Sequence, residues 1–259
     1  MIISKDNSLV KHIRQLKQKK YRDEFKEYVV EGIKIVEEAI QENEEIVLIV
    51  ICDELLKKSI NTTRYKVEFV NKIIFEFISD TVSPQGILAI IKEKNAKKIK
   101  TDVIFALDDI QDPGNMGTII RTLDAAGVKD LIISKESADI YNPKVTRSTM
   151  GAIYRLNVIR TDLLFKLKEM QQDGYKIVVT SLSTDKNHYD INFDEKTIIV
   201  IGNEAKGVSQ EIMEIADVKV KIPMLGKSES LNAAVATGIL AYEYVRNILS
   251  SDTECTPEV

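Results

Sequence analysis

The stretch DVIFALDDIQDPGNMGTIIRTLDAAG (residues 102–127) joins an apolar run, a glycine-containing loop and a segment of helical periodicity that stops at Gly127. Continuous apolar runs are typical of buried strands in parallel sheets, and glycine often follows the last turn of a helix. We therefore predict a strand over 102–110, a loop, and a helix over 117–126. Arg121 lies inside this helix among isoleucine and leucine residues, so its permanent charge needs an explanation.

Segments with strand and helix patterns alternate on both sides of this stretch. The alternation predicts an α/β fold with a mostly parallel sheet that is covered on both faces. The lysine-rich segment KNAKKIK (94–100) is predicted to be a linker. We expect a small α/β domain over 1–97, a second domain over 98–250 and a disordered tail over 251–259. Within the first domain, helices are predicted over 4–20 and 53–60.

The composition excludes several classes of protein. Hydrophobic residues make up 44% and charged residues 29% of the 259 residues, which is typical of a globular protein with a core. Two cysteines, Cys52 and Cys255, and two histidines, His12 and His188, argue against a disulfide framework, a zinc site and catalysis by histidine. We expect Cys52 in the core and Cys255 as a free thiol in the tail. No apolar run is long enough to span a bilayer and no signal peptide is evident, so we expect a cytoplasmic protein.

The charge is distributed unevenly along the chain. The formal net charge is -4, yet the first 26 residues carry eight basic and three acidic side chains. A basic surface of this kind is expected where a protein meets the phosphates of a nucleic acid. A solvated helix face would have the same composition, so charge alone leaves both interpretations open.

Three loops at predicted strand ends contain unusual polar residues. They are LDDIQDPGNMGTIIR (107–121), IIVIGNEAKGVS (198–209) and VKIPMLGKSESLNAAVA (220–236). Ligands of parallel α/β sheets bind beyond the carboxyl ends of the strands, which is where these loops are predicted to lie.

Each loop also has a purely structural interpretation. Asn115 could cap a helix while Arg121 extends to solvent. Glu204 could lie at a helix N-terminus, where a negative charge is favoured, and Ser230 could cap the last helix. The loops match neither the dinucleotide fingerprint nor the P-loop, and the nucleophile elbow of hydrolases is absent from the sequence.

Taken in order, the three loops resemble the signature motifs of the SpoU (TrmH-like) family of RNA 2′-O-ribose methyltransferases, which belongs to the SPOUT class. The matching residues are Asn115-x-Gly117-x-x-x-Arg121, then Gly202-Asn203-Glu204-x-x-Gly207, then Ile222-Pro223-Met224 with Ser230-Leu231-Asn232-Ala233-Ala234-Val235-Ala236. The resemblance covers residues 102–248. The segments YVVEGIKIVEEAI (28–40) and TVSPQGILAI (81–90) resemble the L30e-like substrate-binding domain that often precedes this catalytic domain, and 142–156 resembles the family segment between the first two motifs.

The resemblance implies a SPOUT α/β fold with a deep trefoil knot, and a homodimer in which both subunits build each active site. It implies transfer of a methyl group from S-adenosyl-L-methionine to a ribose 2′-hydroxyl of RNA, without a metal and without a membrane. The expected catalytic residues are Arg121, Asn115, Glu204, Ser230 and Asn232. The expected cofactor-binding residues are Gly202, Asn203, Gly207, Ile222, Met224, Leu231 and Ala233.

Arg121 is the catalytic residue that the family implies. Because a guanidinium stays protonated, we expect it to bind the phosphate or 2′-oxygen of the target nucleotide rather than to act as a base. Lys144 and Arg147 are candidates for RNA phosphate contacts, although ordinary surface charge would explain them equally well.

Other functions remain open at this stage. We expect 23S ribosomal RNA as the substrate, with transfer RNA as the alternative. A non-catalytic RNA-binding or ribosome-assembly factor could keep the same fold, but the three intact loops favour an enzyme. A nucleotide-binding α/β enzyme of another kind is disfavoured because the phosphate fingerprint is missing.

Overall fold

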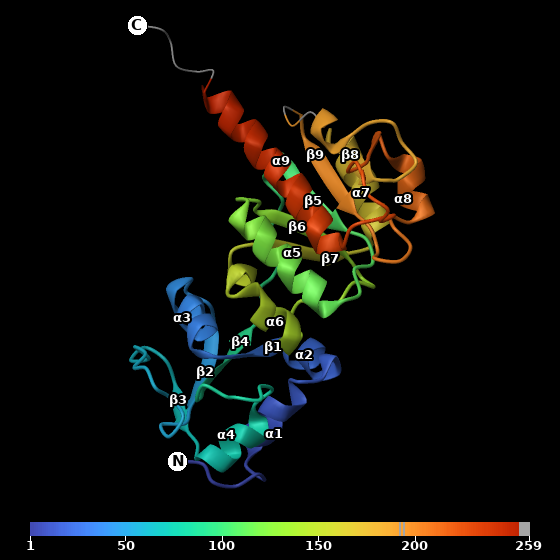
Figure 1. The fold of residues 1–259 in the computed structure, drawn as a ribbon. Helices are drawn as coiled ribbons and strands as arrows, with labels where there is room; N and C mark the ends of the chain where they lie inside the picture. The colour runs from blue at the N-terminus through green and yellow to red at the C-terminus, as the bar shows by residue number, and fades with distance from the viewer. Residues whose placement is uncertain (192, 194, 254–259) are drawn as a thin grey trace, which may run out of the picture. The chain divides into compact units, whose positions relative to one another are not determined.

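The computed structural model describes residues 1–191, 193 and 195–253. The chain forms two compact units, each with its own sheet (Figure 1). The N-terminal unit comprises Met1–Asn95 and Asp139–Arg155, and the C-terminal unit comprises Ala96–Ala138 and the residues from Leu156 onward. We expected one boundary after residue 97, whereas the chain passes between the two units three times.

The N-terminal unit contains a mixed four-stranded sheet. In spatial order its strands are β1 (Glu27–Glu31), β4 (Ile87–Lys92), β2 (Ile46–Ile51) and β3 (Val67–Phe69). Strands β1 and β2 pair antiparallel with β4, and β2 pairs parallel with β3. Strand β4 is buried except at its last residue, because it lies in the middle of the sheet. Cys52, which directly follows β2, is fully buried in this core, as predicted.

The helices of this unit are α1 (Ser8–Gln15), α2 (Lys19–Phe25), α3 (Ile33–Gln41), α4 (Lys72–Ile78), α6 (Pro143–Thr149) and the 3-10 helix η1 (Ala152–Tyr154). The single helix predicted over 4–20 is wrong, because α1 and α2 are separate. The guanidinium of Arg22 donates a hydrogen bond of 2.8 Å to the carbonyl oxygen of Leu16 and so holds the turn between them.

The helix predicted over 53–60 is also wrong, because the chain makes only a turn there. The turn packs tightly on Gly86, where a Cβ atom would lie 2.5 Å from the amide nitrogen of Leu56. The amides of Leu55 and Leu56 donate back to the carbonyl of Cys52, which closes the turn.

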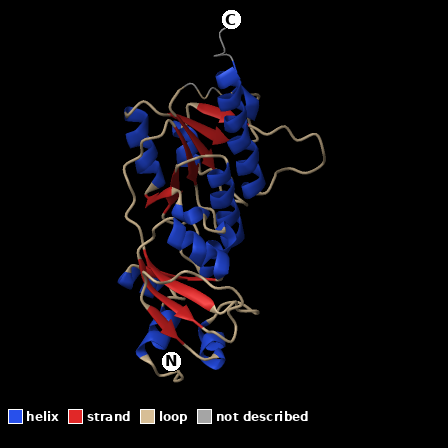
Figure 2. Cartoon of the chain, turned by 90° about the vertical axis from the view of Figure 1, so that its left-hand side faces the viewer, coloured by secondary structure: helices blue, strands red, loops and turns tan. Residues whose placement is uncertain are grey.

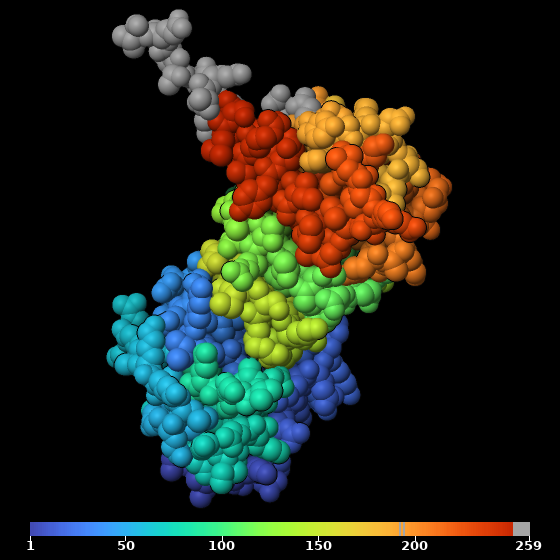
Figure 3. Space-filling model, in the orientation of Figure 1, coloured from blue at the N-terminus to red at the C-terminus, as the bar shows by residue number. Residues whose placement is uncertain are grey.

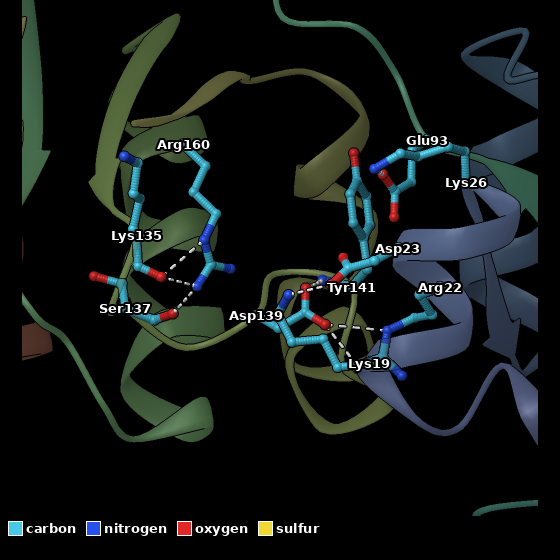
Figure 4. A network of polar contacts seen from close by, with 10 residues as sticks. All are labelled: Lys19, Arg22, Asp23, Lys26, Glu93, Lys135, Ser137, Asp139, Tyr141 and Arg160. Carbon is cyan, nitrogen blue, oxygen red and sulfur yellow. Dashed lines mark hydrogen bonds and ion pairs between the residues drawn. The ribbon is translucent and has the colours of Figure 1, made fainter. Parts of the chain in front are cut away.

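The segment Asp139–Arg155 is attached to the rest of the N-terminal unit by polar and aromatic contacts. Arg22 is 2% exposed and forms an ion pair of 2.5 Å with Asp139 (Figure 4). The rings of Tyr28 and Tyr141 stack with centroids 4.3 Å apart. These contacts explain why a segment distant in the sequence belongs to this unit.

The C-terminal unit contains six strands that are all parallel, which confirms the predicted sheet. Their spatial order is β10 (Val218–Val220), β8 (Lys176–Thr180), β9 (Thr197–Ile201), β5 (Val103–Leu107), β6 (Asp130–Ser134) and β7 (Asn157–Thr161). Strands β5 and β9 are buried throughout, as expected from their continuous apolar sequences. The edge strand β7 was not predicted, because its sequence NVIRT lacks a continuous apolar run.

Helices lie on both sides of this sheet (Figure 2). They are α5 (Pro113–Ala125), α7 (Leu163–Gln172), α8 (Gln210–Ile215), α9 (Ala233–Thr253) and the 3-10 helix η2 (His188–Asp190). Helix α9 packs along α5 (Figure 1) and continues past residue 250, where we predicted a tail. The rest of the predicted tail, including Cys255, lies outside the described residues. Among the helices that the structure describes, none is long and apolar enough to cross a membrane.

The strand order places a change of direction between β5 and β9. From β5 the chain builds the sheet outward to β6 and β7, and then continues on the other side of β5 with β8, β9 and β10. The loops that follow β5 and β9 therefore leave neighbouring strands at such a switch point. In open α/β sheets this is the usual place for a ligand.

Candidate active site

The loop after β5 ends at a capped helix. Asp112 is the N-cap of α5, and its carboxylate accepts a hydrogen bond of 2.8 Å from the amide of Asn115. Pro113 follows at the first helical position, where its missing N–H costs nothing. The helix therefore begins at Pro113 rather than at residue 117, and the alternative in which Asn115 is the cap is wrong. The side chain of Asn115 is free to make other contacts.

Asn115 joins all three loops through its side-chain amide. Its Nδ2 donates to Oε1 of Glu204 over 2.8 Å, and its Oδ1 accepts from Nδ2 of Asn232 over 2.9 Å. The sequence separations are 89 and 117 residues, so the fold brings these groups together. We call Asn115, Glu204 and Asn232 the amide–carboxylate network.

Asn232 has a second role at the start of α9. Its Oδ1 accepts hydrogen bonds from the amides of Ala234 at 2.9 Å and Val235 at 3.3 Å. Asn232 therefore caps the helix, and the alternative in which Ser230 is the cap is wrong. The cap also fixes the orientation of the Asn232 side chain toward Asn115.

Glu204 accepts hydrogen bonds from the first loop as well. The amides of Gln111 and Asp112 donate to its carboxylate at 3.4 and 3.5 Å. Partial burial raises the pKa of Glu204, but the bond from Asn115 and the backbone amides outweigh burial and lower the pKa below its ordinary value. Glu204 is thus an anion that holds two loops together. The alternative with Glu204 at a helix N-terminus is wrong, because α8 begins only at Gln210.

The second loop folds back on itself. Two backbone hydrogen bonds of 2.9 Å join Asn203 and Gly207, and Gly207 has a φ of +70°. A Cβ atom on Gly202 would lie 2.1 Å from the carbonyl carbon of Gly207, so this position requires glycine. The side chain of Asn203 donates to the carbonyl of Asp109 over 2.7 Å, which ties this loop to the first one.

A cavity of about 410 Å³ lies beside the network at the ends of β8, β9 and β10. All seven expected cofactor-binding residues line it: Gly202, Asn203, Gly207, Ile222, Met224, Leu231 and Ala233. Glu204 and Ser230 line it too, and its volume is typical of sites for small molecules. We did not predict Thr180, Ser181 and Leu182, which also line it. The polar pair Thr180-Ser181, where the apolar strand β8 ends, was the available signal.

Arg121 is separate from this cavity. It lies on the exposed face of α5 and is absent from the cavity lining. Within the part of the chain that the structure describes, its side chain makes no hydrogen bond or ion pair. Four of the five expected catalytic residues are therefore at or beside the cavity, whereas Arg121 projects to solvent, as one of the two interpretations of the sequence requires.

The two expected RNA-binding residues lie on α6 in the N-terminal unit. Lys144 is exposed. Arg147 is half-buried beside a small hollow that Lys17, Glu31 and Asp80 also line. No group of three His, Cys, Asp or Glu side chains suited to a metal ion occurs in residues 1–191, 193 and 195–253.

The chain matches two family models. Residues 102–242 match the model of the SpoU rRNA Methylase family. The chain belongs to this family. Residues 7–89 match the MRM3-like substrate binding domain. The family expected from the three loops is therefore confirmed, together with a substrate-binding domain before the catalytic one.

Similar proteins of known name support this assignment. The 23S rRNA (guanosine(2553)-2′-O)-methyltransferase RlmP of Bacillus subtilis is 32% identical over 93% of this chain and 97% of its own length. The AdoMet-bound rRNA methyltransferase from Sinorhizobium meliloti superposes with a TM-score of 0.85, at 29% identity, over 95% of this chain and 97% of that chain. The SpoU methyltransferase AviRb from Streptomyces viridochromogenes, in complex with AdoMet, has a TM-score of 0.85 at 25% identity, over 94% of this chain and 99% of that chain. The expected cofactor is confirmed for the family by these two complexes.

Proposed function

We propose that this protein transfers the methyl group of S-adenosylmethionine to a ribose 2′-hydroxyl of 23S ribosomal RNA. The main support is the amide–carboxylate network, which joins the three motif loops beside a cavity of about 410 Å³. The names of the relatives supply the substrate class, because RlmP methylates the ribose of 23S rRNA. The proposed reaction takes place in the cytoplasm, where we expect the protein to meet ribosomal RNA.

The cavity suits an adenosyl cofactor. Ile222, Met224 and Leu231 supply apolar surface for a flat base. The loops also present peptide groups there, around Gly202, which can recognise the polar edge of the base. When bound, the cofactor supplies a methyl group on a positively charged sulfur, which makes that carbon electrophilic.

The chain itself must position the ribose and stabilise charge on its oxygen. A ribose hydroxyl is a weak acid, so negative charge develops as its proton leaves. In our proposal Arg121 binds the target nucleotide and stabilises that charge. We do not assign Glu204 as the base, because the hydrogen bonds from Asn115 and two backbone amides lower its pKa and so weaken it as a proton acceptor. Ser230, which lines the cavity, is placed to contact the acceptor nucleotide.

We propose that the protein is a homodimer in which Arg121 completes the site of the other subunit. Helix α9 exposes Val235 (52%), Tyr242 (54%) and Leu249 (62%), which follow one another at seven-residue intervals. They form an apolar stripe on one face of α9. Figure 3 shows that this helix lies at the surface. Such a stripe is suited to pairing with an identical helix. The exposed guanidinium of Arg121, on the neighbouring helix α5, could then enter the cavity of the other subunit.

Two further parts of the proposal rest on the relatives. We propose that the C-terminal unit has the deep trefoil knot of the SPOUT class, because it resembles the SpoU methyltransferase AviRb over 94% of the chain. We also propose that the N-terminal unit binds RNA, with Lys144 and Arg147 as phosphate contacts. In the same unit Lys5 and Arg14 lie 4.5 and 4.2 Å from the ring centroid of Phe77, a cationic and aromatic surface suited to RNA.

The direct test combines binding and mapping. Calorimetry with S-adenosylmethionine should show one site per chain, and ribose methylation should be mapped in total RNA from cells with and without the gene. We expect one 2′-O-methyl position of 23S rRNA to disappear without the gene. If a 2′-O-methyl position of transfer RNA disappears instead, the substrate is transfer RNA. Absence of cofactor binding would leave only a non-catalytic RNA-binding function.

A further inference from the structure

The loop of residues 108–112, between β5 and α5, is held from two sides. On one side it contacts the second motif loop through Asn203 and Glu204, as described above. On the other side it contacts the turn that follows β6. Because residues 108–112 supply the amides that bind Glu204, their position decides where the carboxylate lies.

Two buried serines form the second set of contacts. Ser134 and Ser137 are 3% and 2% exposed, and their hydroxyl oxygens lie 2.9 Å apart. The amide of Asp109 donates to Oγ of Ser134 over 3.0 Å, and the amide of Ile110 donates to Oγ of Ser137 over 3.2 Å. Asp109 has a φ of +59°, a conformation that few residues other than glycine adopt, so these bonds help to hold it.

Arg160 holds this turn from the surface. It lies on the edge strand β7 and is exposed. Its Nη2 donates to the carbonyl of Ser137 over 2.6 Å, and its Nε donates to the carbonyl of Lys135 over 3.1 Å (Figure 4). A planar guanidinium can bridge two carbonyl groups in this way, whereas an ammonium acts as a single point charge.

We propose that Arg160 is a positioning residue for methyl transfer. It fixes the turn 135–137, and Ser137 of that turn binds the amide of Ile110 and the hydroxyl of Ser134 at the end of β6. Ser134 in turn binds the amide of Asp109, and the loop then presents Gln111 and Asp112 to Glu204. Nothing in the three signature motifs includes Arg160 or the two serines. The inference rests on the proposed methyltransferase activity, but the geometry that it concerns is measurable without that activity.

The test uses the full-length protein and four variants. Arg160→Ala removes the hydrogen bonds to both carbonyl groups of the turn, Arg160→Lys restores a positive donor, and Ser137→Ala removes the acceptor for Ile110. Lys166→Ala is the matched control, because Lys166 makes an exposed ion pair on α7 in the same unit. We would measure kcat and KM on a 23S rRNA transcript, the affinity for S-adenosylmethionine, and amide hydrogen exchange over residues 108–112.

We expect Arg160→Ala to lower kcat about ten-fold, since a small displacement of a catalytic group is costly. Its affinity for S-adenosylmethionine should stay within about two-fold, hydrogen exchange should quicken over 108–112, and Arg160→Lys should recover part of kcat. Ser137→Ala should show the same pattern. Unchanged exchange over 108–112 would overturn the proposal, and so would a fall in kcat that Lys166→Ala shares. A wild-type protein without activity on the transcript would contradict the proposed function, while the exchange measurement would still decide the role of Arg160.

Discussion

Asn115 and Arg121 lie six residues apart on α5, and their surroundings are opposite. Both polar ends of the Asn115 amide are hydrogen-bonded to residues of the other two motif loops. Arg121 is exposed and, among the residues that the structure describes, has no polar partner. On the same helix, the side chain of Asn115 therefore has its hydrogen-bond partners within the chain, whereas the side chain of Arg121 has none among the described residues.

The difference separates two kinds of functional residue. The amide–carboxylate network can be recognised in a single chain, because its members satisfy one another. A residue that acts on a bound molecule or on a second subunit has no such partners, so in a single chain it resembles ordinary surface charge. Experiments on each group can test whether Arg121 finds its partners outside its own chain.

The largest effect is expected for Arg121→Ala. Loss of one charge-stabilising donor typically costs about 10²–10³ in kcat, and we expect a loss of at least that size. Affinity for S-adenosylmethionine should change little, because Arg121 is proposed to contact the target nucleotide rather than the cofactor. Methylation of the 23S transcript and calorimetry would measure both. Lys129→Ala, at an exposed position after the same helix, is the control, and an Arg121→Ala protein with normal turnover would remove the residue from the mechanism.

Mixing two inactive variants tests whether the residues act across subunits. If Arg121 acts on the partner's cavity, a mixed dimer of Arg121→Ala and Glu204→Ala has one intact site. Random pairing makes half of the dimers mixed, so about a quarter of wild-type activity should return. Assays after unfolding and refolding the two variants together would measure it. If both residues serve the same chain, no activity will return.

The apolar stripe on α9 should be needed for pairing. Tyr242→Glu places a charge in the centre of the stripe, so we expect monomers in sedimentation velocity and loss of activity. Ile73→Glu is the matched control, because Ile73 is 66% exposed on α4 of the N-terminal unit. A Tyr242→Glu protein that remains dimeric would exclude this face as the subunit contact.

RNA contacts on α6 should have a smaller effect. Lys144→Ala should weaken binding of the 23S transcript a few-fold and reduce the slope of log affinity against log salt by about 1, the contribution of one phosphate contact. Filter binding at several salt concentrations would show it. Lys57→Ala, at another exposed position of the same unit, should leave the slope unchanged. Equal slopes for wild type and Lys144→Ala would exclude the contact.

The smallest effect concerns pH. The folded pKa of Glu204 is lowered, so its ionised form stabilises the folded state at neutral pH, and this contribution is lost as the pH falls through the folded pKa. Glu204→Gln should therefore lower the melting temperature at pH 7, and the difference from wild type should shrink in acid. Thermal unfolding from pH 7 down to about pH 3, below the ordinary pKa of a glutamate, would measure the difference. A constant difference would mean that the charge of Glu204 does not stabilise the loops.

The sequence predicts some of these features and not others, for physical reasons. The parallel sheet follows from buried apolar strands such as β5 and β9, whereas the expected cavity residues came from the resemblance of the three loops to the motifs of the SpoU family. The cap at Asp112 was missed because Asp112 and Asn115 are equally suited to that role. The contacts of Asn115 with Glu204 and Asn232 depend on which strands are neighbours, and local patterns do not contain that information. The same holds for the stacking of Tyr28 on Tyr141.

The three passages of the chain between its units have a practical consequence for dissection by proteases or by truncation. A cut among the lysines of residues 97–100 would leave two fragments that still hold each other, because Asp139–Arg155 would remain packed on the N-terminal fragment. Conversely, residues 1–95 produced alone would leave the buried guanidinium of Arg22 without Asp139. The ring of Tyr28 would also lose its stacking on Tyr141, so we expect the N-terminal fragment to be more stable with the distant segment grafted back.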